Sequence, residues 1–352
     1  MVSQKLRIVA LTLLAPLLGL AAVLGGCRPV ERPEADAKPD SYLFCFWNVE
    51  NLFDDKDNNR KGPGDREYDP WFANDPKIRE LKYSNLSKAL VQLNDGKGPD
   101  ILALAEVESV RAAELLQEAL NKRLEDESLH YTSVLMKELT AGRHIAPAIL
   151  TRLPVQSDRT RLHGRRQRIL EGHVVVDGQD LVILATHWTS RIRQGGQQRA
   201  EYGDQIYGTF KAMYKRNPQV DVLICGDFND TPQDESVTKH LHATGDLQAV
   251  RNSPADDPLL LNLLAGKSAE DGWGTHFDRG RWFIFDQIVV SPGMLDDAGW
   301  TCDPDSVKVE KVTANPHDKK GRPWRFGSKS DKHERGYSDH FPVTVRLKVH
   351  PK

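Results

Sequence analysis

Two short polar motifs in this chain each place a carboxylate beside a second functional group. Ser338-Asp339-His340 sets a carboxylate next to an imidazole. Gly226-Asp227-Phe228-Asn229 follows an apolar run, and strand alternation would direct its carboxylate and carboxamide to one side. Imidazole titrates near neutral pH and can take a proton from water, whereas carboxylates bind hard divalent cations. The two motifs could thus supply a general base and ligands for a cation, although each motif alone also fits an ordinary strand end or turn.

Three further segments place polar side chains within or after apolar runs: Trp47-Asn48-Val49-Glu50-Asn51, Leu104-Ala105-Glu106-Val107-Glu108 and Phe285-Asp286-Gln287-Ile288. Glu106 ends one apolar run, so a strand would hold it at the rim of a sheet. A hard cation such as Mg²⁺ or Mn²⁺ prefers an oxygen ligand of this kind. The alternative is that Glu106 is a capping acid for the helix expected from Val110.

The elements that must position these residues are short strands and a few amphipathic helices. Strands are predicted from β-branched and aromatic runs at Tyr42–Trp47, Ile101–Ala105, Tyr131–Leu135, Ala146–Leu150, Gly172–Val176, Leu181–Ala185, Val220–Cys225, Phe283–Val290 and Val343–Val349. Helices are predicted from periodicity at Ile78–Leu93, Val110–Leu124 and Gln197–Lys215. The charged stretch from Asp54 to Pro76 is predicted to be a long surface loop. Strands early and late in the chain with helices between them indicate a layered α/β domain.

Taken in this order, the five polar segments resemble the endonuclease/exonuclease/phosphatase family, the metal-dependent phosphodiesterases related to DNase I and the abasic-site endonucleases. The resemblance extends from about Ser41 to Val349. It implies a four-layer α/β sandwich over residues 41–352, in which two packed mixed β-sheets are flanked by helices (DNase I-like). The active site would lie where strand ends of both sheets meet.

The resemblance also assigns roles to single residues. It makes His340 the general base that activates a water molecule, with Asp286 holding its imidazole. It assigns Glu106 as the main metal ligand, with Asn48 beside it and Asp339 on the metal side. The cofactor implied is therefore Mg²⁺ or Mn²⁺, and the resemblance does not say whether one or two ions bind.

Four more residues receive roles in contacting the phosphate. By resemblance, Asp227 orients the nucleophilic water or handles the leaving oxygen, and Asn229 holds a phosphate oxygen. His187 resembles the family's phosphate-contacting histidine, and Arg143 stands where relatives grip the scissile phosphate. Pro147 departs from the usual pattern after Arg143. The alternatives are a structural His187 and an exposed surface Arg143.

The net charge of the chain gives no general electrostatic attraction for a polyanionic substrate. The chain carries 48 Lys and Arg against 50 Asp and Glu, without the basic excess usual for a nucleic-acid binder. Polyanion binding would therefore depend on local patches, of which Arg159–Arg168 and Arg191–Arg199 flank the strand pair leading to His187. Trp188, Trp273 and Trp282 are either base-stacking or core residues.

These features predict an extracytoplasmic nuclease acting on DNA or RNA. A lipid or inositol-phosphate phosphodiesterase or phosphatase of the same fold is the alternative. A surface binding protein on an inactive scaffold is disfavoured, because every expected catalytic position holds a competent side chain. No protein partner is inferred.

The N-terminal segment is typical of an exported lipoprotein. Residues 1–26 combine basic Lys5 and Arg7 with an apolar run and end in Leu24-Gly25-Gly26 before Cys27. We expect residues 1–26 to be a signal peptide, Cys27 to be lipidated, and residues 27–40 to form a short tether to a membrane of the cell envelope (outer membrane or cell surface). An uncleaved membrane anchor is the alternative.

Three further cysteines follow the leader. Cys45 and Cys225 stand in apolar runs, and Cys302 makes an odd third. Buried free thiols are expected, although export would permit a Cys45–Cys225 bridge.

Overall fold

The computed structural model describes residues 41–139, 142–164, 167–191 and 195–350. The predicted signal peptide (1–26), the tether (27–40) and Cys27 lie outside these residues. Among the helices that are described, none is long and apolar enough to span a membrane.

The first sheet joins the N-terminal and C-terminal strands of the described chain. Its six strands run in the order β14 (Gly299–Val309), β15 (Val343–His350), β1 (Tyr42–Leu52), β2 (Ile101–Val107), β4 (Ala146–Thr151) and β3 (Ser133–Met136). β1 pairs parallel with β2 and antiparallel with β15. The segment before β15, which carries His340, therefore lies beside the end of β1.

The second sheet is also mixed. Its seven strands run in the order β5 (Arg161–His163), β6 (Ile169–Val176), β7 (Gln179–His187), β8 (Asp221–Asp227), β13 (Asp286–Val290), β10 (Leu260–Asn262) and β9 (Ala243–Thr244). β7 and β8 are parallel, whereas β13 runs antiparallel to β8. A separate two-stranded hairpin, β11 (His276–Asp278) and β12 (Arg281–Phe283), precedes β13.

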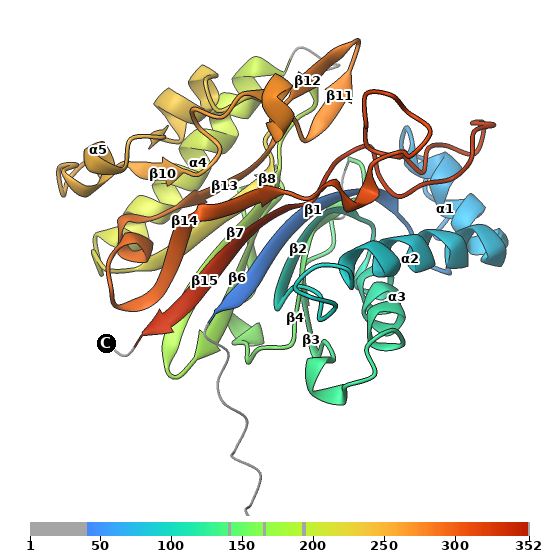
Figure 1. The fold of residues 1–352 in the computed structure, drawn as a ribbon, viewed down its shortest axis with the longest axis horizontal. Helices are drawn as coiled ribbons and strands as arrows, with labels where there is room; N and C mark the ends of the chain where they lie inside the picture. The colour runs from blue at the N-terminus through green and yellow to red at the C-terminus, as the bar shows by residue number, and fades with distance from the viewer. Residues whose placement is uncertain (1–40, 140–141, 165–166, 192–194, 351–352) are drawn as a thin grey trace, which may run out of the picture. The chain divides into compact units, whose positions relative to one another are not determined.

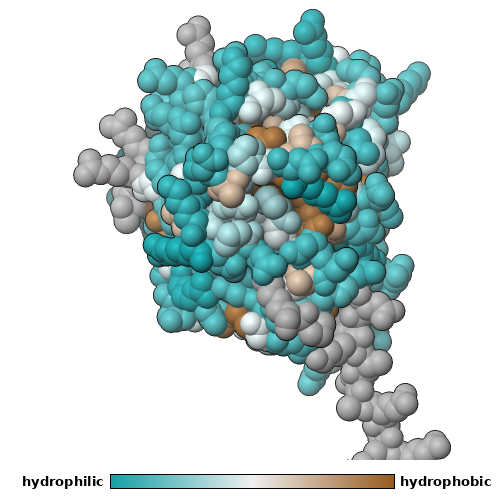
Figure 2. Space-filling view, turned by 90° about the vertical axis from the view of Figure 1, so that its left-hand side faces the viewer, coloured by the Kyte–Doolittle hydropathy of each residue, from teal (hydrophilic) through white to brown (hydrophobic). Residues whose placement is uncertain are grey.

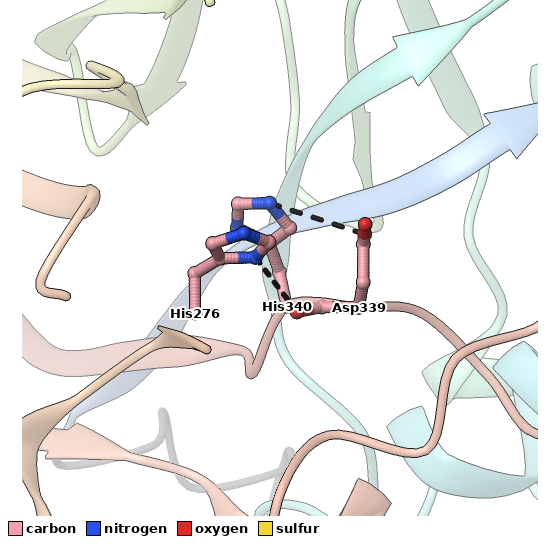
Figure 3. Close-up of side chains that lie close together, drawn as sticks. All are labelled: His276, Asp339 and His340. Atoms are coloured by element: carbon pink, nitrogen blue, oxygen red, sulfur yellow. Dashed lines mark hydrogen bonds and ion pairs between the residues drawn. The ribbon is translucent and has the colours of Figure 1, made fainter. Parts of the chain in front are cut away.

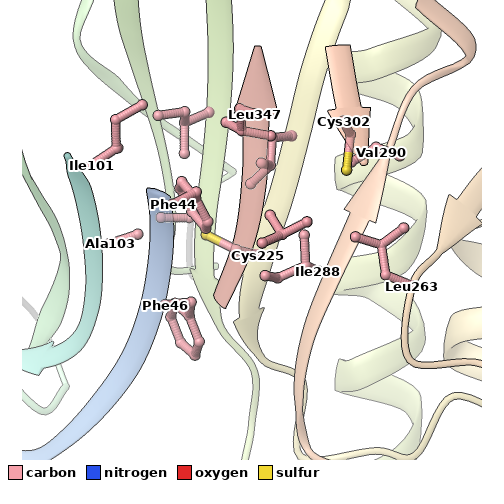
Figure 4. Close-up of a cluster of buried hydrophobic side chains, with 14 of the residues drawn as sticks. Phe44, Phe46, Ile101, Ala103, Cys225, Leu263, Ile288, Val290, Cys302 and Leu347 are labelled. Carbon is pink, nitrogen blue, oxygen red and sulfur yellow. The ribbon is translucent and has the colours of Figure 1, made fainter. Parts of the chain in front are cut away.

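Strand alternation divides the apolar residues between an inter-sheet core and two outer cores. In β1, Phe44 and Phe46 face the second sheet, where they meet Ile288 and Cys225 (Figure 4). The alternate residues Cys45 and Trp47 face helices instead. Such a strand is buried on both faces, which is why it reads as a continuous apolar run.

Helices cover the outer faces of both sheets (Figure 1). α2 (Pro76–Leu90) and α3 (Val110–Asn121) share a core with the first sheet, and α4 (Gly196–Tyr214) shares one with the second. The short helix α5 (Leu247–Arg251) follows β9. The four-layer sandwich expected from the resemblance is confirmed.

The surface loop predicted for Asp54 to Pro76 is wrong in its second half. Residues Asp65–Asn74 form a helix, α1, in which Tyr68, Trp71 and Phe72 are buried. Their spacing is helical, but Pro70 and the surrounding glycines and charges concealed it. These rings pack with Phe326 in a separate aromatic cluster, so α1 anchors a distant loop.

Two other sequence predictions need correction. The single strand expected at Phe283–Val290 is interrupted, because β12 ends at Phe283 and β13 begins at Asp286. Strand β14 was missed, since its polar residues lack a clear alternation. The expected free thiols are confirmed, for Cys45, Cys225 and Cys302 are all buried and unbridged.

Candidate active site

Strand ends from both sheets meet along one cleft. Register places Asp227 of β8 opposite Asp286 on one side and His187 of β7 on the other. Glu106 from β2 and His340 from the segment before β15 line the same cleft. Residues from five distant parts of the chain are thus brought together, as the sequence predicted.

Irregular backbone at these strand ends aims the side chains into the cleft. The β1–β2 and β2–β4 ladders shift register near Asn48 and Val107. Glu50, Asn51, Glu106 and Asn229 all adopt positive φ, between 51° and 65°. Bulged strand ends and left-handed residues that are not glycine are unfavourable, and they concentrate at functional sites.

His340 is held by a buried carboxylate. Its Nδ1 lies 2.7 Å from Asp286 Oδ2, and both side chains are buried. Because a carboxylate only accepts hydrogen bonds, Nδ1 carries a proton and Nε2 faces the cleft. Nε2 lies 3.7 Å from Asp227 Oδ2 and 3.9 Å from Asp339 Oδ1. Burial alone would lower the pKa of His340, but the Asp286 and Asp227 carboxylates raise it well above its ordinary value.

Asp227 connects the two halves of the cleft. Asn48 Nδ2 donates to Asp227 Oδ2 at 3.0 Å, and the backbone N–H of Asn229 donates to Oδ1 at 2.9 Å. Burial raises the pKa of Asp227, a shift that His340 opposes. Asn229 lies after the strand end, where its side chain donates to the carbonyl of Trp188 at 3.2 Å and lines the cleft.

Glu106 lines the same cleft as His340. Its Oε2 accepts from the backbone N–H of Asn51 at 2.9 Å, and its Oε1 lies 3.8 Å from His187 Nε2. The capping alternative is wrong, because Ser109 caps α3 by accepting from the N–H of Ala112.

His187 is neutral at ordinary pH. Burial lowers its pKa to about 4, an effect that the nearby Asp227 only partly opposes. Its Nδ1 is buried and has no hydrogen-bond partner among the described residues. A neutral imidazole can donate a hydrogen bond to a phosphate oxygen without adding charge to the cleft.

The donor set fits a hard divalent cation. Glu106, Asp227 and Asp339 present carboxylate oxygens to one cleft, whereas the buried Asn48 carboxamide donates to Asp227 and accepts from the backbone N–H of Glu50. Neutral His187 offers no balancing charge. Oxygen ligands of this kind suit Mg²⁺ or Mn²⁺, so the carboxylates of the cleft fit such an ion in chemical type.

Arg143 reaches the cleft with its orientation fixed. Its Nε donates to Asp65 Oδ1 at 3.0 Å, and its guanidinium also donates to Asn51 Oδ1. Asp65 is buried at the start of α1 and also accepts from the backbone N–H of His144 at 2.8 Å. The exposed-arginine alternative therefore does not describe Arg143, because α1 orients it.

Sequence reasoning missed His276. In Figure 3 it lies against His340, with the ring centroids 4.3 Å apart. Its Nδ1 donates to the backbone carbonyl of Asp339 at 3.0 Å. Ligand atoms of His276, Asp339 and His340 lie within 4.8 Å of one another. A lone histidine on a short strand gives no sequence signal. Its place in the site becomes visible only through the isolated antiparallel β-bridge that pairs His276 with His340.

Sequence reasoning also missed a buried lysine. Lys82 on α2 is fully buried and donates to the carbonyls of Glu50 at 3.0 Å and Tyr337 at 2.6 Å. It thus joins the end of β1 to the segment that carries Asp339. Burial lowers its pKa to about 8, although nearby carboxylates favour the charged form. The sequence of α2 offers no hint that this lysine side chain would face inward.

The predicted arginine tracks reach the cleft only in part. Arg168 and Arg191 line it, whereas Arg161 pairs with Glu171 on the second sheet and Arg199 pairs with Asp230. Residues 165–166 and 192–194 lie outside the described residues. Base stacking by Trp188 is wrong, because its ring is buried between Phe228 and Tyr202.

Comparison with known proteins decides the family. The model of the Endonuclease/Exonuclease/phosphatase family matches residues 43–349. The chain belongs to this family. Its members are hydrolases that act on phosphoesters and generally use divalent metals, which agrees with the cleft described above. No curated protein matches the sequence.

Solved structures share the fold at low sequence identity. A family member from Bacteroides thetaiotaomicron superposes with a TM-score of 0.52 at 16% identity, covering 89% of this chain and 100% of that one. Truncated TDP2 from Caenorhabditis elegans gives 0.50 at 16% identity, covering 88% and 98%. TDP2 from D. rerio, complexed with a single-strand DNA product, gives 0.50 at 15% identity, covering 88% and 100%.

Proposed function

We propose that this protein is a divalent-metal-dependent phosphodiesterase that hydrolyses nucleic acid. The observation that supports this best is the arrangement around His340. Its Nδ1 is bonded to Asp286, while its Nε2 faces Asp227. Glu106 lines the same cleft. A general base, a metal ligand and a phosphate-binding arginine therefore surround one space.

Each side chain has a distinct part in the proposed reaction. When bound, the divalent cation would neutralise charge on the phosphate. Once it has lost its own proton, His340 Nε2 takes a proton from the attacking water, and the buried Asp286 stabilises the resulting imidazolium. Asp227 orients that water or the leaving oxygen. His187, Asn229 and Arg143 bind the non-bridging oxygens as charge develops on them.

Surface chemistry favours nucleic acid over a membrane lipid. The tip of the β11–β12 hairpin beside the cleft carries Asp278, Arg279 and Arg281 and so is charged. Among the described residues, Leu81 is the only large hydrophobic side chain that is clearly exposed. The face drawn in Figure 2 is mostly hydrophilic, with hydrophobic residues confined to small patches. A lipid hydrolase would need an apolar element that enters the bilayer.

One assay tests this proposal. The full chain is incubated with plasmid DNA, RNA, sphingomyelin and an inositol phosphate, in Mg²⁺ or Mn²⁺ and then with EDTA. We expect metal-dependent cutting of nucleic acid that His340→Ala abolishes. His240→Ala is the matched control, because His240 is exposed and bonds Asp204 away from the cleft. Turnover of lipid or inositol phosphate alone would favour the alternative substrate, and inactivity on all four would indicate a binding protein.

We further propose that the protein is exported and anchored through a lipid on Cys27. The support is the basic, apolar and small-residue order of residues 1–26. Fractionation of cells expressing the full chain should place the wild type with membranes and Cys27→Ala in the soluble fraction or as unprocessed precursor. Membrane attachment of Cys27→Ala with an uncleaved N-terminus, detected by mass spectrometry, would instead indicate a protein anchor.

A further inference from the structure

A basic loop forms one wall of the cleft. The residues numbered 315–336, between β14 and β15, are here termed the basic loop. They contain seven Lys and Arg against three Asp and Glu, although the whole chain has a formal charge of −2. In Figure 1 this loop lies at the same edge of the molecule as the β11–β12 hairpin. Its His317, Arg322 and Trp324 line the cleft together with Phe277 of the hairpin.

The loop is held firmly against the body of the protein. Glu50 is buried and accepts from Arg325 Nη2 at 2.7 Å and from the backbone N–H of Phe326 at 2.8 Å. Phe326 is buried in the aromatic cluster with α1. Asn85 of α2 donates to the carbonyl of Gly336 at 2.7 Å. The loop therefore presents a preformed surface, which reduces the ordering cost of binding.

Four lysines on this loop have no carboxylate partner among the described residues. The loop's three acidic residues are engaged elsewhere: Asp318 with Arg322 at 2.8 Å, Asp331 with the N–H of Ser328 at 2.7 Å, and Glu334 with His317 at 4.0 Å. The exposed lysines without ion pairs are Lys319, Lys320, Lys329 and Lys332. Their charge is available to a polyanion.

Aromatic rings accompany these cations. Lys320 Nζ and Arg322 Cζ each lie 5.2 Å from the ring centroid of Phe277, which joins the basic loop to the hairpin by cation–π contacts. Trp324 is half-buried, and its indole N–H donates to the carbonyl of Glu334 at 3.1 Å, which fixes the ring at the cleft. A fixed ring beside exposed cations suits a flat base attached to a phosphate backbone.

We propose that the basic loop is a single-strand docking site for the polynucleotide whose cleavage is proposed above. Trp324 stacks on an unpaired base, and the four lysines contact phosphates outside the scissile one. Duplex DNA fits less well, since its bases already stack on one another and leave no free face. The inference rests on the proposed function for its substrate, but binding can be measured without cleavage.

The experiment is fluorescence anisotropy of a labelled 20-nucleotide single strand with the full chain in EDTA, over a range of salt concentrations. The quadruple Lys319→Gln, Lys320→Gln, Lys329→Gln, Lys332→Gln variant should bind at least about 10-fold more weakly. Its log Kd–log salt slope should fall by about 3, because each phosphate contact on a single strand contributes about 0.7. The matched control replaces four exposed lysines elsewhere: Lys97, Lys122, Lys215 and Lys348.

Trp324 is tested separately. Trp324→Ala should weaken binding about 5- to 150-fold without changing the salt slope, because stacking contributes about 1–3 kcal/mol per base. Trp324→Phe should restore most of the affinity if the ring stacks on a base. The thermal stability of both variants is measured as well, because a role of Trp324 in folding alone would not lower affinity while stability is unchanged.

Several results would overturn the docking site. The first is equal binding of the single strand by the quadruple variant and its control. The second is that a duplex binds as tightly as the single strand or more tightly. The third is that the quadruple variant loses binding only to vesicles of anionic phospholipid and not to the single strand. Since EDTA prevents cutting, a failure of the nuclease assay and a failure of binding are distinguishable. Binding that depends on the loop in a protein that cleaves no nucleic acid would support the docking site and refute the nuclease.

Discussion

At the scale of single residues, the site depends on pairs in which one buried side chain orients another. Asp286 fixes His340, and Asp65 fixes Arg143. The first pair was predicted from the sequence, whereas the second was not. An acid in an apparent loop has no visible partner until α1 brings it beside the arginine. Removing the orienting member should therefore affect activity through the residue that it holds.

The His340–Asp286 pair gives the first prediction. His340→Ala should lower kcat about 10²- to 10⁴-fold, the usual contribution of a positioned base. Asp286→Asn should lower kcat less and should move the acid limb of the pH–rate profile to lower pH. The reason is that Asp286 raises the pKa of His340, so its neutralisation lets the imidazole lose its proton at lower pH. An unchanged acid limb in Asp286→Asn would contradict this pairing.

The Asp65–Arg143 pair gives the second. Asp65→Asn and Arg143→Ala should each lower kcat/KM, by about 10-fold or more. The double variant should be little worse than Arg143→Ala, because residues that act through one contact are not additive. Steady-state kinetics on the preferred substrate and circular dichroism of each variant provide the measurement. Fully additive losses would show that Asp65 acts independently of the arginine.

At the scale of elements, a network of buried ion pairs lies on part of the second sheet, at strands β5, β6 and β7. Glu171 of β6 is buried and contacts His163, His173 and Arg161. His173 Nδ1 lies 2.9 Å from Asp180 Oδ1, and its Nε2 lies 3.1 Å from Glu171 Oε1. Because carboxylates only accept, both ring nitrogens must donate, so His173 is an imidazolium here.

This network gives a prediction for stability against pH. Burial by itself would lower the pKa of His173, but Asp180 and Glu171 raise it above 6.5. A raised pKa contributes stability that is complete below the unfolded value and is lost as pH rises through the folded one. The melting temperature of the wild type should therefore fall by a few degrees above about pH 6.5, relative to His173→Gln.

Glu171 acts in a separate pH window. Burial alone would raise its pKa, but the hydrogen bonds from both histidines and Arg161 lower it far below its usual range. Its contribution is therefore lost only in acid, below the ordinary glutamate pKa of about 4.3.

For the His173 prediction, the His240→Gln variant controls for the loss of an exposed histidine. Parallel melting curves for His173→Gln and the wild type between pH 6 and 9 would refute the imidazolium.

At the scale of the whole molecule, the packing of two sheets brings carboxylates from distant strands into one cleft. Carboxylates from β2, β8 and the segment before β15 face a common space. If these carboxylates bind a divalent cation in the folded protein only, metal binding and stability should be coupled.

The coupling can be measured by thermal unfolding. Mg²⁺ or Mn²⁺ at 100 times its Kd should stabilise the protein by about 2.7 kcal/mol, and EDTA should reverse the rise in melting temperature. Glu106→Gln should lose most of this metal-dependent rise, whereas Glu114→Gln, at an exposed position on α3, should keep it. An equal rise in both variants would show that the ion binds elsewhere.

The sequence predicted most strands and several residues of the candidate site because both leave local signals. A strand buried on two faces is a continuous apolar run, and the polar residue that ends it must lie at the rim of a sheet. Glu106, Asp227 and Asp286 were found in this way. Lys82, Asp65 and His276 could not be, since their importance comes from neighbours 30 or more positions away in the chain.

By itself, the sequence determined the family, the two-sheet sandwich and the residue types around the cleft. It could not determine which charges remain free. Arg161 and Arg199 look equivalent to Arg168 in the sequence, yet Glu171 of β6 pairs with Arg161 and Asp230, just after β8, pairs with Arg199. The tertiary structure decided this, because an ion pair depends on a separation of a few ångströms that only packing sets.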